Sequence, residues 1–317
     1  MISTLILSAT GGDIGISVLK ILKNAGFRVI ALDMNPSSVA KNYADAFYIV
    51  PSAKSDEYTN VTINIARKEN ADSFMPISEP EIIRVNKDRG IFRKSGIKTA
   101  INNSFIVETF SDKLKTSLFL AEIGLNVPGT CLLTDYTSEF SFPFIVKDRL
   151  GCGNKTVKLI EHETDLQYII HKNTKGTLIA QEYIDVEDAE YTTGIFSDGS
   201  RISTVSFKRT LGYGGLSRCV ELVCEPELEK IAKKIAKSSK LRGSINLQTR
   251  RKNGIFYPFE INPRISSTVA FRTYIGFNDP CWWIKILNGG KYEYNPKYKT
   301  GKGIKVLSEY YYDLEEI

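Results

Sequence analysis

The first third of the chain alternates short apolar runs with amphipathic segments, and this alternation restricts its fold more than any other feature. The apolar runs lie at residues 3–9, 27–33 and 73–77, and segments with helical periodicity separate them at 11–26 and 60–71. A strand–helix–strand–helix–strand order is typical of a parallel sheet with helices on both faces. We therefore expect residues 1–104 to form a doubly wound α/β domain.

The remaining two thirds mix helices and strands in a less regular order. A second unit begins near Asp112, and the last third is rich in strands with one helix expected at residues 226–240.

Composition places the chain among globular proteins. Its 317 residues, 42% hydrophobic and 25% charged, suffice for two or three domains. The net charge of +6 is dispersed among acids, so no nucleic-acid partner is required and a polyanionic small ligand explains it equally well. No apolar run is long enough to predict a membrane span, and residues 1–12 fit a first strand better than a signal peptide. The five cysteines lack paired CxxC spacing, which favours a reducing cytoplasm.

A glycine cluster follows the first expected strand. Thr10, Gly12 and Gly15 occupy the positions of a GxGxxG fingerprint, and Asp33 ends the second strand, where a ribose-binding acid would lie. Because the match is partial, a tight strand-to-helix turn is favoured over nicotinamide dinucleotide binding.

Two acids follow the third expected strand. Glu79 and Glu81 lie at its carboxyl end, where open α/β sheets bind ligands. They are candidate substrate residues, and ordinary exposed loop acids are the alternative.

A glycine-rich segment at 142–160 joins two expected strands. Lys147 ends the first strand, and Gly151 and Gly153 follow it. Glycines let backbone N–H groups approach phosphate oxygens, and a lysine neutralises their charge. A plain surface hairpin remains an equal alternative on this segment alone.

The next segment, 177–196, places an acidic connector between two strands. Gln181, Glu182, Tyr183 and Ile184 end the first strand, and Glu190 opens the second. A connector backbone is able to pair with adenine and a nearby acid with ribose hydroxyls, although an ordinary acidic connector has the same composition.

The segment FYPFEINPRISST, residues 256–268, has the length of a strand but carries a polar row. Alternation places Glu260, Asn262 and Arg264 on one face. It leaves Phe259, Ile261 and Ile265 on the opposite face, which we expect to be buried. On the row alone, a solvated sheet face is the favoured explanation. The rigid Asn–Pro–Arg turn that ends the strand also suits a binding site.

Taken together, these segments resemble the ATP-grasp superfamily, most closely its carbamoyl-phosphate-synthase-like carboxylate–amine ligases. The resemblance runs from end to end and is most specific in GSINLQTRRKNGIFYPFEINPRISST, residues 243–268. It implies a pre-ATP-grasp domain at 1–104, followed by a two-lobed α+β ATP-grasp fold with a small lobe at 105–184 and a carboxyl-terminal lobe at 185–317. It also implies binding of ATP with Mg²⁺, or with Mn²⁺ in its place.

The resemblance assigns roles to individual residues. Lys113 and Lys147 would contact phosphates, as the loop of Gly151 and Gly153 would, and Arg264 would stabilise the reacting phosphoryl group. Adenine would meet the connector Gln181–Ile184, chiefly Glu182 and Ile184 through their backbone, and Glu190 would meet ribose. The metal ligands would be Gln248, Glu260 and Asn262. Gln248 replaces an acid found in many ATP-grasp enzymes, which puts a second metal in doubt.

The implied reaction is ATP-dependent activation of a small carboxylate as an acylphosphate, which an amine then attacks. For the substrates, the loop at 211–218 offers Arg209 and Arg218 as candidate carboxylate ligands, with solvated surface arginines as the alternative. A kinase-like enzyme that makes a carbamoyl or acyl phosphate is the nearest alternative. A nicotinamide-dependent oxidoreductase and a non-catalytic nucleotide-binding module are more distant. We expect no nucleic-acid or membrane partner and leave the oligomeric state open, with a homodimer as one option.

Overall fold

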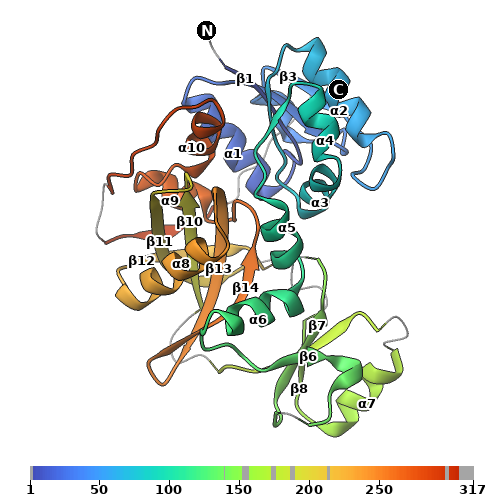
Figure 1. Cartoon of the computed structure of the whole chain (residues 1–317), viewed down its shortest axis with the longest axis vertical. Coiled ribbons are helices and arrows are strands. Elements are labelled where there is room, and N and C mark those ends of the chain that lie inside the picture. Colours follow the sequence, from blue (N-terminus) through green and yellow to red (C-terminus); the bar gives the residue numbers. More distant parts are fainter. Residues whose placement is uncertain are drawn as a thin grey trace.

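The computed structural model describes residues 3–306 apart from 139, 152–156, 173–175, 186–189, 213–214 and 297–299. Gly153, which was expected to approach phosphate, lies outside the described residues. Those that are described form three sheets in chain order, and Figure 1 shows the second, with strands β6 to β9, projecting from the rest of the molecule. In the described part of the chain, no helix has the length and apolar character needed to cross a membrane.

The first sheet is parallel, with strand order β3-β2-β1-β4-β5, so the expected doubly wound domain is confirmed. Its order reverses between β1 and β4, and the loops that follow these two strands meet at this switch point. Its elements are β1 (Thr4–Leu7), α1 (Asp13–Asn24), β2 (Arg28–Asp33), η1 (Val39–Asn42), β3 (Ala46–Ile49), α2 (Tyr58–Lys68), β4 (Ser73–Met75), α3 (Glu79–Lys87), α4 (Arg89–Lys94) and β5 (Lys98–Thr99).

The glycine cluster after β1 has a packing role. A Cβ atom on Gly15 would lie 2.1 Å from the carbonyl oxygen of Ala9, so only glycine lets α1 start this close to the strand. The carboxylate of Asp33 accepts hydrogen bonds from the N–H groups of Gly11 (2.6 Å) and Asn35 (2.8 Å). These contacts favour the tight-turn interpretation over a nicotinamide site.

The second sheet is a small antiparallel lobe with strand order β6-β9-β7-β8. It has an apolar core of its own, which includes Leu133, Phe144 and Ala180. Two helices lead into it. The elements are α5 (Ser104–Phe110), α6 (Lys113–Glu122), β6 (Thr130–Leu132), η2 (Leu133–Asp135), β7 (Phe144–Asp148), β8 (Lys158–Ile160), α7 (Glu163–Lys172) and β9 (Leu178–Glu182).

The third sheet is antiparallel, with strand order β14-β13-β10-β11-β12-β15. Helix α8 buries Leu228, Ile231 and Ile235 at helical spacing and packs against β10 and β11. Where one helix was expected, α9 and α10 also occur. The elements are β10 (Glu190–Ser197), β11 (Ile202–Leu211), β12 (Ser217–Val223), α8 (Pro226–Ser238), β13 (Gly243–Lys252), β14 (Ile255–Asn262), α9 (Val269–Tyr274), α10 (Asp279–Leu287) and β15 (Lys302–Ile304).

The first and third sheets share one core. Buried side chains of α1 pack in the same cluster as side chains of α9, α10 and β11, and α1 contacts both α9 and α10. The buried side chain of Asn102 donates hydrogen bonds to the carbonyl oxygens of Ser244 (2.8 Å) and Pro263 (3.0 Å). The first domain is therefore fastened to the strand end that carries the polar row.

Candidate active site

The polar row belongs to a polar face of the third sheet. Gln248 lies opposite Glu260 and Asn246 lies opposite Asn262, because β13 and β14 pair in antiparallel register. Cross-strand partners share a face, so the three predicted metal ligands come together on two neighbouring strands. The amide nitrogen of Asn262 donates to Glu260 Oε1 (2.8 Å). This leaves the amide oxygen as the group that Asn262 offers to a cation.

A β-bulge changes the face of Phe259. The register of β13 and β14 shifts between Gln248 and Thr249, so that Thr249 pairs with Pro258. Phe259 is the extra residue, and it lines the same pocket as Glu260 instead of lying on the buried face expected from alternation. Its ring lies 5.5 Å from Lys147 Nζ. The expectation of a buried Phe259 was wrong, whereas Ile261 and Ile265 are buried as expected.

A pocket of about 500 Å³ lies between the small lobe and the third sheet. Its size suits a nucleotide. It brings together most of the residues predicted to bind nucleotide. They come from α6, from β7 and the loop that follows it, from the connector and from the polar face of the third sheet. Its predicted members are Lys113, Lys147, Gly151, Gln181, Glu182, Ile184, Glu190, Arg209, Gln248 and Glu260.

Lys147 lines this pocket and is 5% exposed. Its Nζ donates to Gln181 Oε1 (2.8 Å), and Gln181 Nε2 donates onward to Thr130 Oγ1 (2.9 Å). Burial lowers the pKa of Lys147 to about 8, and the nearby Lys113 also lowers it, while the Glu260 carboxylate opposes the shift. A buried cation of this kind favours an anionic ligand.

Lys113 opens helix α6 and reaches the glycine-rich segment. Its Nζ donates to the carbonyl oxygen of Gly151, which adopts a positive φ of 92°. Asp112 caps α6 by accepting from the N–H groups of Leu114 and Lys115, and its carboxylate also accepts two hydrogen bonds of 2.9 Å from Arg149 Nε. The cap and the ion pair hold Lys113 beside the loop.

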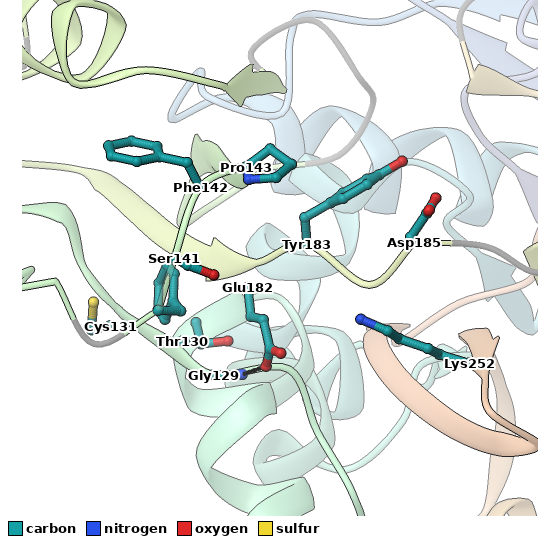
Figure 2. A pocket seen from close by; sticks show the side chains of 11 residues that line it. Gly129, Thr130, Cys131, Ser141, Phe142, Pro143, Glu182, Tyr183, Asp185 and Lys252 are labelled. Atoms are coloured by element: carbon teal, nitrogen blue, oxygen red, sulfur yellow. Dashed lines mark hydrogen bonds between the residues drawn. The ribbon is translucent and has the colours of Figure 1, made fainter.

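Within the connector, residues 181–184, Glu182 is hydrogen-bonded to the segment that precedes β6. Glu182 Oε2 accepts from the N–H group of Gly129 (3.1 Å), and the N–H group of Glu182 donates to the carbonyl oxygen of Gly129 (2.8 Å). Figure 2 shows this contact in a second concavity behind the connector, where Tyr183 and Phe142 also lie. The Tyr183 ring is 5.3 Å from the Arg250 guanidinium. Tyr183 therefore supports the connector from outside the nucleotide-sized pocket.

A smaller pocket of about 360 Å³ adjoins the first and shares Arg209, Gln248 and Glu260 with it. Its other walls are the switch-point loops of the first domain and the turn after β14. Of the predicted residues, it includes Glu79, Asn262 and Arg264, and Gly12 and Gly15 also border it. Of the row, Glu260 thus lies where the two pockets meet, whereas Asn262 and Arg264 line the smaller pocket alone.

The four substrate candidates have different surroundings. Glu79 is 6% exposed, and burial raises its pKa although Arg264 and Lys113 nearby counteract this. Glu81 instead closes a capping box by accepting from the backbone N–H group of Ser78 (3.1 Å), and it lines neither pocket.

The two arginines also differ. Arg209 is buried against Glu190, with its Nε 3.0 Å from Glu190 Oε1. Arg218 is exposed on β12 and lines neither pocket.

Some lining residues were missed from the sequence. Arg250 lines the larger pocket, and Asn246 and Ser267 line the smaller one. Arg250 and Asn246 lie two residues on either side of Gln248, so the same alternation that indicated the row would have found them. Ser267 carries no such signal because it follows the strand.

Two family models match the chain. A PylC-like N-terminal domain model matches residues 5–100, and a model described as ATP-grasp in the biosynthetic pathway with Ter operon matches residues 174–310. Residues 174–310 therefore carry an ATP-grasp domain. Because the second match starts inside the unit expected at 105–184, the boundary at 184 stays a prediction.

Relatives and solved structures agree with this family. The carbamoyl phosphate synthase large chain of Thermoanaerobacter sp. (strain X514) is 25% identical over 276 residues, which cover 80% of this chain and 25% of the relative. This ATP-grasp chain therefore spans about a quarter of the length of the curated relatives it matches.

The solved structures share the ATP-grasp fold. N5-carboxyaminoimidazole synthetase from Staphylococcus aureus, complexed with ADP, has a TM-score of 0.79 at 16% identity, over 96% of this chain and 82% of that one. The biotin carboxylase domain of Hydrogenobacter thermophilus 2-oxoglutarate carboxylase, complexed with MgADP and bicarbonate, has a TM-score of 0.76 at 17% identity, over 94% and 72%. The expected two-lobed ATP-grasp fold is confirmed.

Proposed function

We propose that this ATP-grasp protein is an ATP-dependent ligase that activates a small carboxylate as an acylphosphate for attack by an amine. The observation that carries the proposal is the meeting of two pockets at the polar row. The larger has room for a nucleotide and the smaller for a small substrate, and they share Gln248, Glu260 and Arg209. A phosphoryl group bound at this junction would face both compartments.

The nucleotide is assigned to the larger pocket. Lys113, Lys147 and the loop of Gly151 and Gly153 would hold its phosphates, because cations and exposed N–H groups there neutralise negative charge. Adenine would lie against the connector from Gln181 to Ile184. The relatives crystallised with ADP and MgADP support nucleotide binding in this fold.

The ribose is assigned to the first residue of β10. Glu190 lines the larger pocket, and its carboxylate would accept hydrogen bonds from the sugar hydroxyls.

The oxygen donors of Gln248, Glu260 and Asn262 fit a hard cation such as Mg²⁺. When bound, the ion would neutralise the negative charge of the phosphates. Glu260 is the one acid of this set, and its hydrogen bond from Asn262 holds the two side chains side by side. Mn²⁺ has the same ligand preferences.

The chain's own residues would do the rest by positioning. Arg264 would stabilise the phosphoryl group during its transfer to the carboxylate oxygen, and ADP would leave from the larger pocket. Glu79 and Arg209, which both line the smaller pocket, would orient the substrates, one as a hydrogen-bond acceptor and the other as a donor. The proposal assigns no role to Glu81 or Arg218, since neither lines a pocket.

The experiment is an ADP-release screen of the purified chain against pairs of small carboxylates and amines, with Mg²⁺. A ligase requires both substrates and yields one amide per ADP, which mass spectrometry detects. The Glu260→Gln variant is the control for contaminating ATPase activity. Absence of turnover with bound nucleotide would favour a non-catalytic module.

One observation supports a kinase-like alternative. The relatives that match 80% of this chain are carbamoyl phosphate synthase large chains. ADP release that needs a carboxylate or carbamate but no amine, and that yields an acyl or carbamoyl phosphate, would favour this reaction over the ligase.

A further inference from the structure

The acid assigned to ribose is held by an arginine from the neighbouring strand. Glu190 on β10 lies directly opposite Arg209 on β11. Arg209 Nε donates to Glu190 Oε1 (3.0 Å), and Arg209 Nη2 donates to the same oxygen. The two side chains are only 6% and 12% exposed, so solvent screens this pair weakly.

The second oxygen of Glu190 has a different environment. Arg250, opposite Glu190 on the other neighbouring strand, places Nη2 3.7 Å from Glu190 Oε2. That distance is an ion pair but exceeds a hydrogen bond. Arg250 Nη1 instead donates to the carbonyl oxygen of Ile184 (3.0 Å). Glu190 therefore has one oxygen fixed by Arg209 and another with hydrogen-bonding capacity towards the nucleotide pocket.

We propose that Arg209 is a positioning residue for ribose recognition: it orients the Glu190 carboxylate so that Oε2 receives the sugar hydroxyls. The inference rests on the proposed function, which puts a nucleotide in the larger pocket. Two donors on one oxygen fix the carboxylate plane, and an oriented charged acceptor binds a hydroxyl more strongly than one that rotates. Preference for ribose over a sugar without hydroxyls then depends on Arg209, which need not touch the sugar.

The same guanidinium reaches the smaller pocket with its remaining nitrogen. Arg209 Nη1 lies 3.4 Å from Ser217 Oγ, and Ser217 Oγ lies 3.4 Å from the Oγ of Ser267, which lines that pocket. Glu190 takes the Nε and Nη2 edge of the guanidinium, so Nη1 is the nitrogen with which Arg209 reaches the smaller pocket. Arg209 would thus act in ribose binding through Glu190 and in substrate binding in the smaller pocket.

The test compares MgADP with magnesium 2′,3′-dideoxy-ADP by calorimetry. We expect the wild type to bind ADP about tenfold to a hundredfold more tightly, the scale of charge-assisted hydrogen bonds. Arg209→Met should reduce that ratio to near one with little change in affinity for the dideoxy nucleotide. Glu190→Gln should reduce the ratio similarly, and Arg209→Lys should restore part of it.

Arg242→Met is the matched control, because Arg242 is exposed and lines neither pocket. It should keep the wild-type ratio. Circular dichroism checks that each variant is folded, and Arg209→Lys carries the test if Arg209→Met is not. An unchanged ratio in the Arg209 variants, or a wild type that binds both nucleotides equally, would overturn the inference while leaving the ligase proposal intact. A wild type that binds neither nucleotide would overturn both.

Discussion

At the scale of single residues, the lowered pKa of the buried Lys147 makes both the stability of the chain and its expected affinity for nucleotide depend on pH. Its pKa of about 8 lies below the ordinary 10.5 because burial disfavours the charged form. The unfolded chain therefore binds more protons than the folded chain between these values. The contribution of Lys147 to the free energy of unfolding is least favourable below pH 8 and improves as pH rises towards 10.5.

Nucleotide affinity should have the opposite dependence. Phosphate charge favours protonated Lys147, so we expect MgADP affinity to be nearly constant below pH 7 and to fall as pH rises through 8, approaching tenfold per unit. Calorimetry from pH 6.5 to 9.5 measures this. In Lys147→Met the affinity should be low and the decline around pH 8 should be absent. A wild-type affinity that stays level to pH 9.5 would contradict the assignment of Lys147 to phosphate.

Glu260 allows fold and catalysis to be separated. Glu260→Gln keeps an oxygen that accepts from Asn262 Nδ2 but removes the one negative charge of the proposed metal set. We expect substrate-dependent ADP release to fall by about two orders of magnitude and the Mg²⁺ requirement to rise, with little change in melting temperature. Titrating Mg²⁺ in the ADP-release assay measures both effects. Wild-type turnover by this variant would mean that the row is only a solvated sheet face.

At the level of elements, the turn between β1 and α1 distinguishes a packing glycine from a cofactor glycine. A Cβ atom would lie 2.1 Å from the Ala9 carbonyl oxygen at Gly15 but 3.6 Å from it at Gly12, which is an ordinary contact. Gly15→Ala should therefore destabilise the chain by roughly 2 kcal/mol or more, and Gly12→Ala by less than about 0.5 kcal/mol. Chemical denaturation of the two variants gives the comparison. Equal stability of both would refute the packing role of Gly15.

The strands of the third sheet show which features of the site follow from the sequence and which depend on strand pairing. Alternation along β14 predicted the shared face of Glu260 and Asn262, because the period of a strand is local information. It failed at Phe259, because the bulge depends on how β14 pairs with β13. The partner of Glu190 was also missed. Arg209 is close to it only through a register that no local pattern encodes.

At the level of the whole molecule, the division between apolar cores predicts which parts of the structure unfold separately. The first domain and the third sheet share one cluster, whereas the small lobe has its own, built from residues between Cys131 and Ala180. We expect native-state hydrogen exchange to show β6, β7 and β9 opening as a separate unit of lower free energy, and MgADP to protect them. The first domain and third sheet should exchange together. One uniform opening free energy across all three sheets would contradict this division.

The smaller pocket also has a consequence for how this protein acquires new specificity. Its amino-terminal wall comes from the turn after β1 and the loop after β4, and neither contributes to the described lining of the larger pocket. The two family models also match separate parts of the chain, one the first domain at 5–100 and the other residues 174–310. On the proposed function, these two loops would set substrate specificity, whereas the residues assigned to the nucleotide line the larger pocket. Exchanging the two loops between relatives is the shortest route to a different substrate on the same catalytic framework.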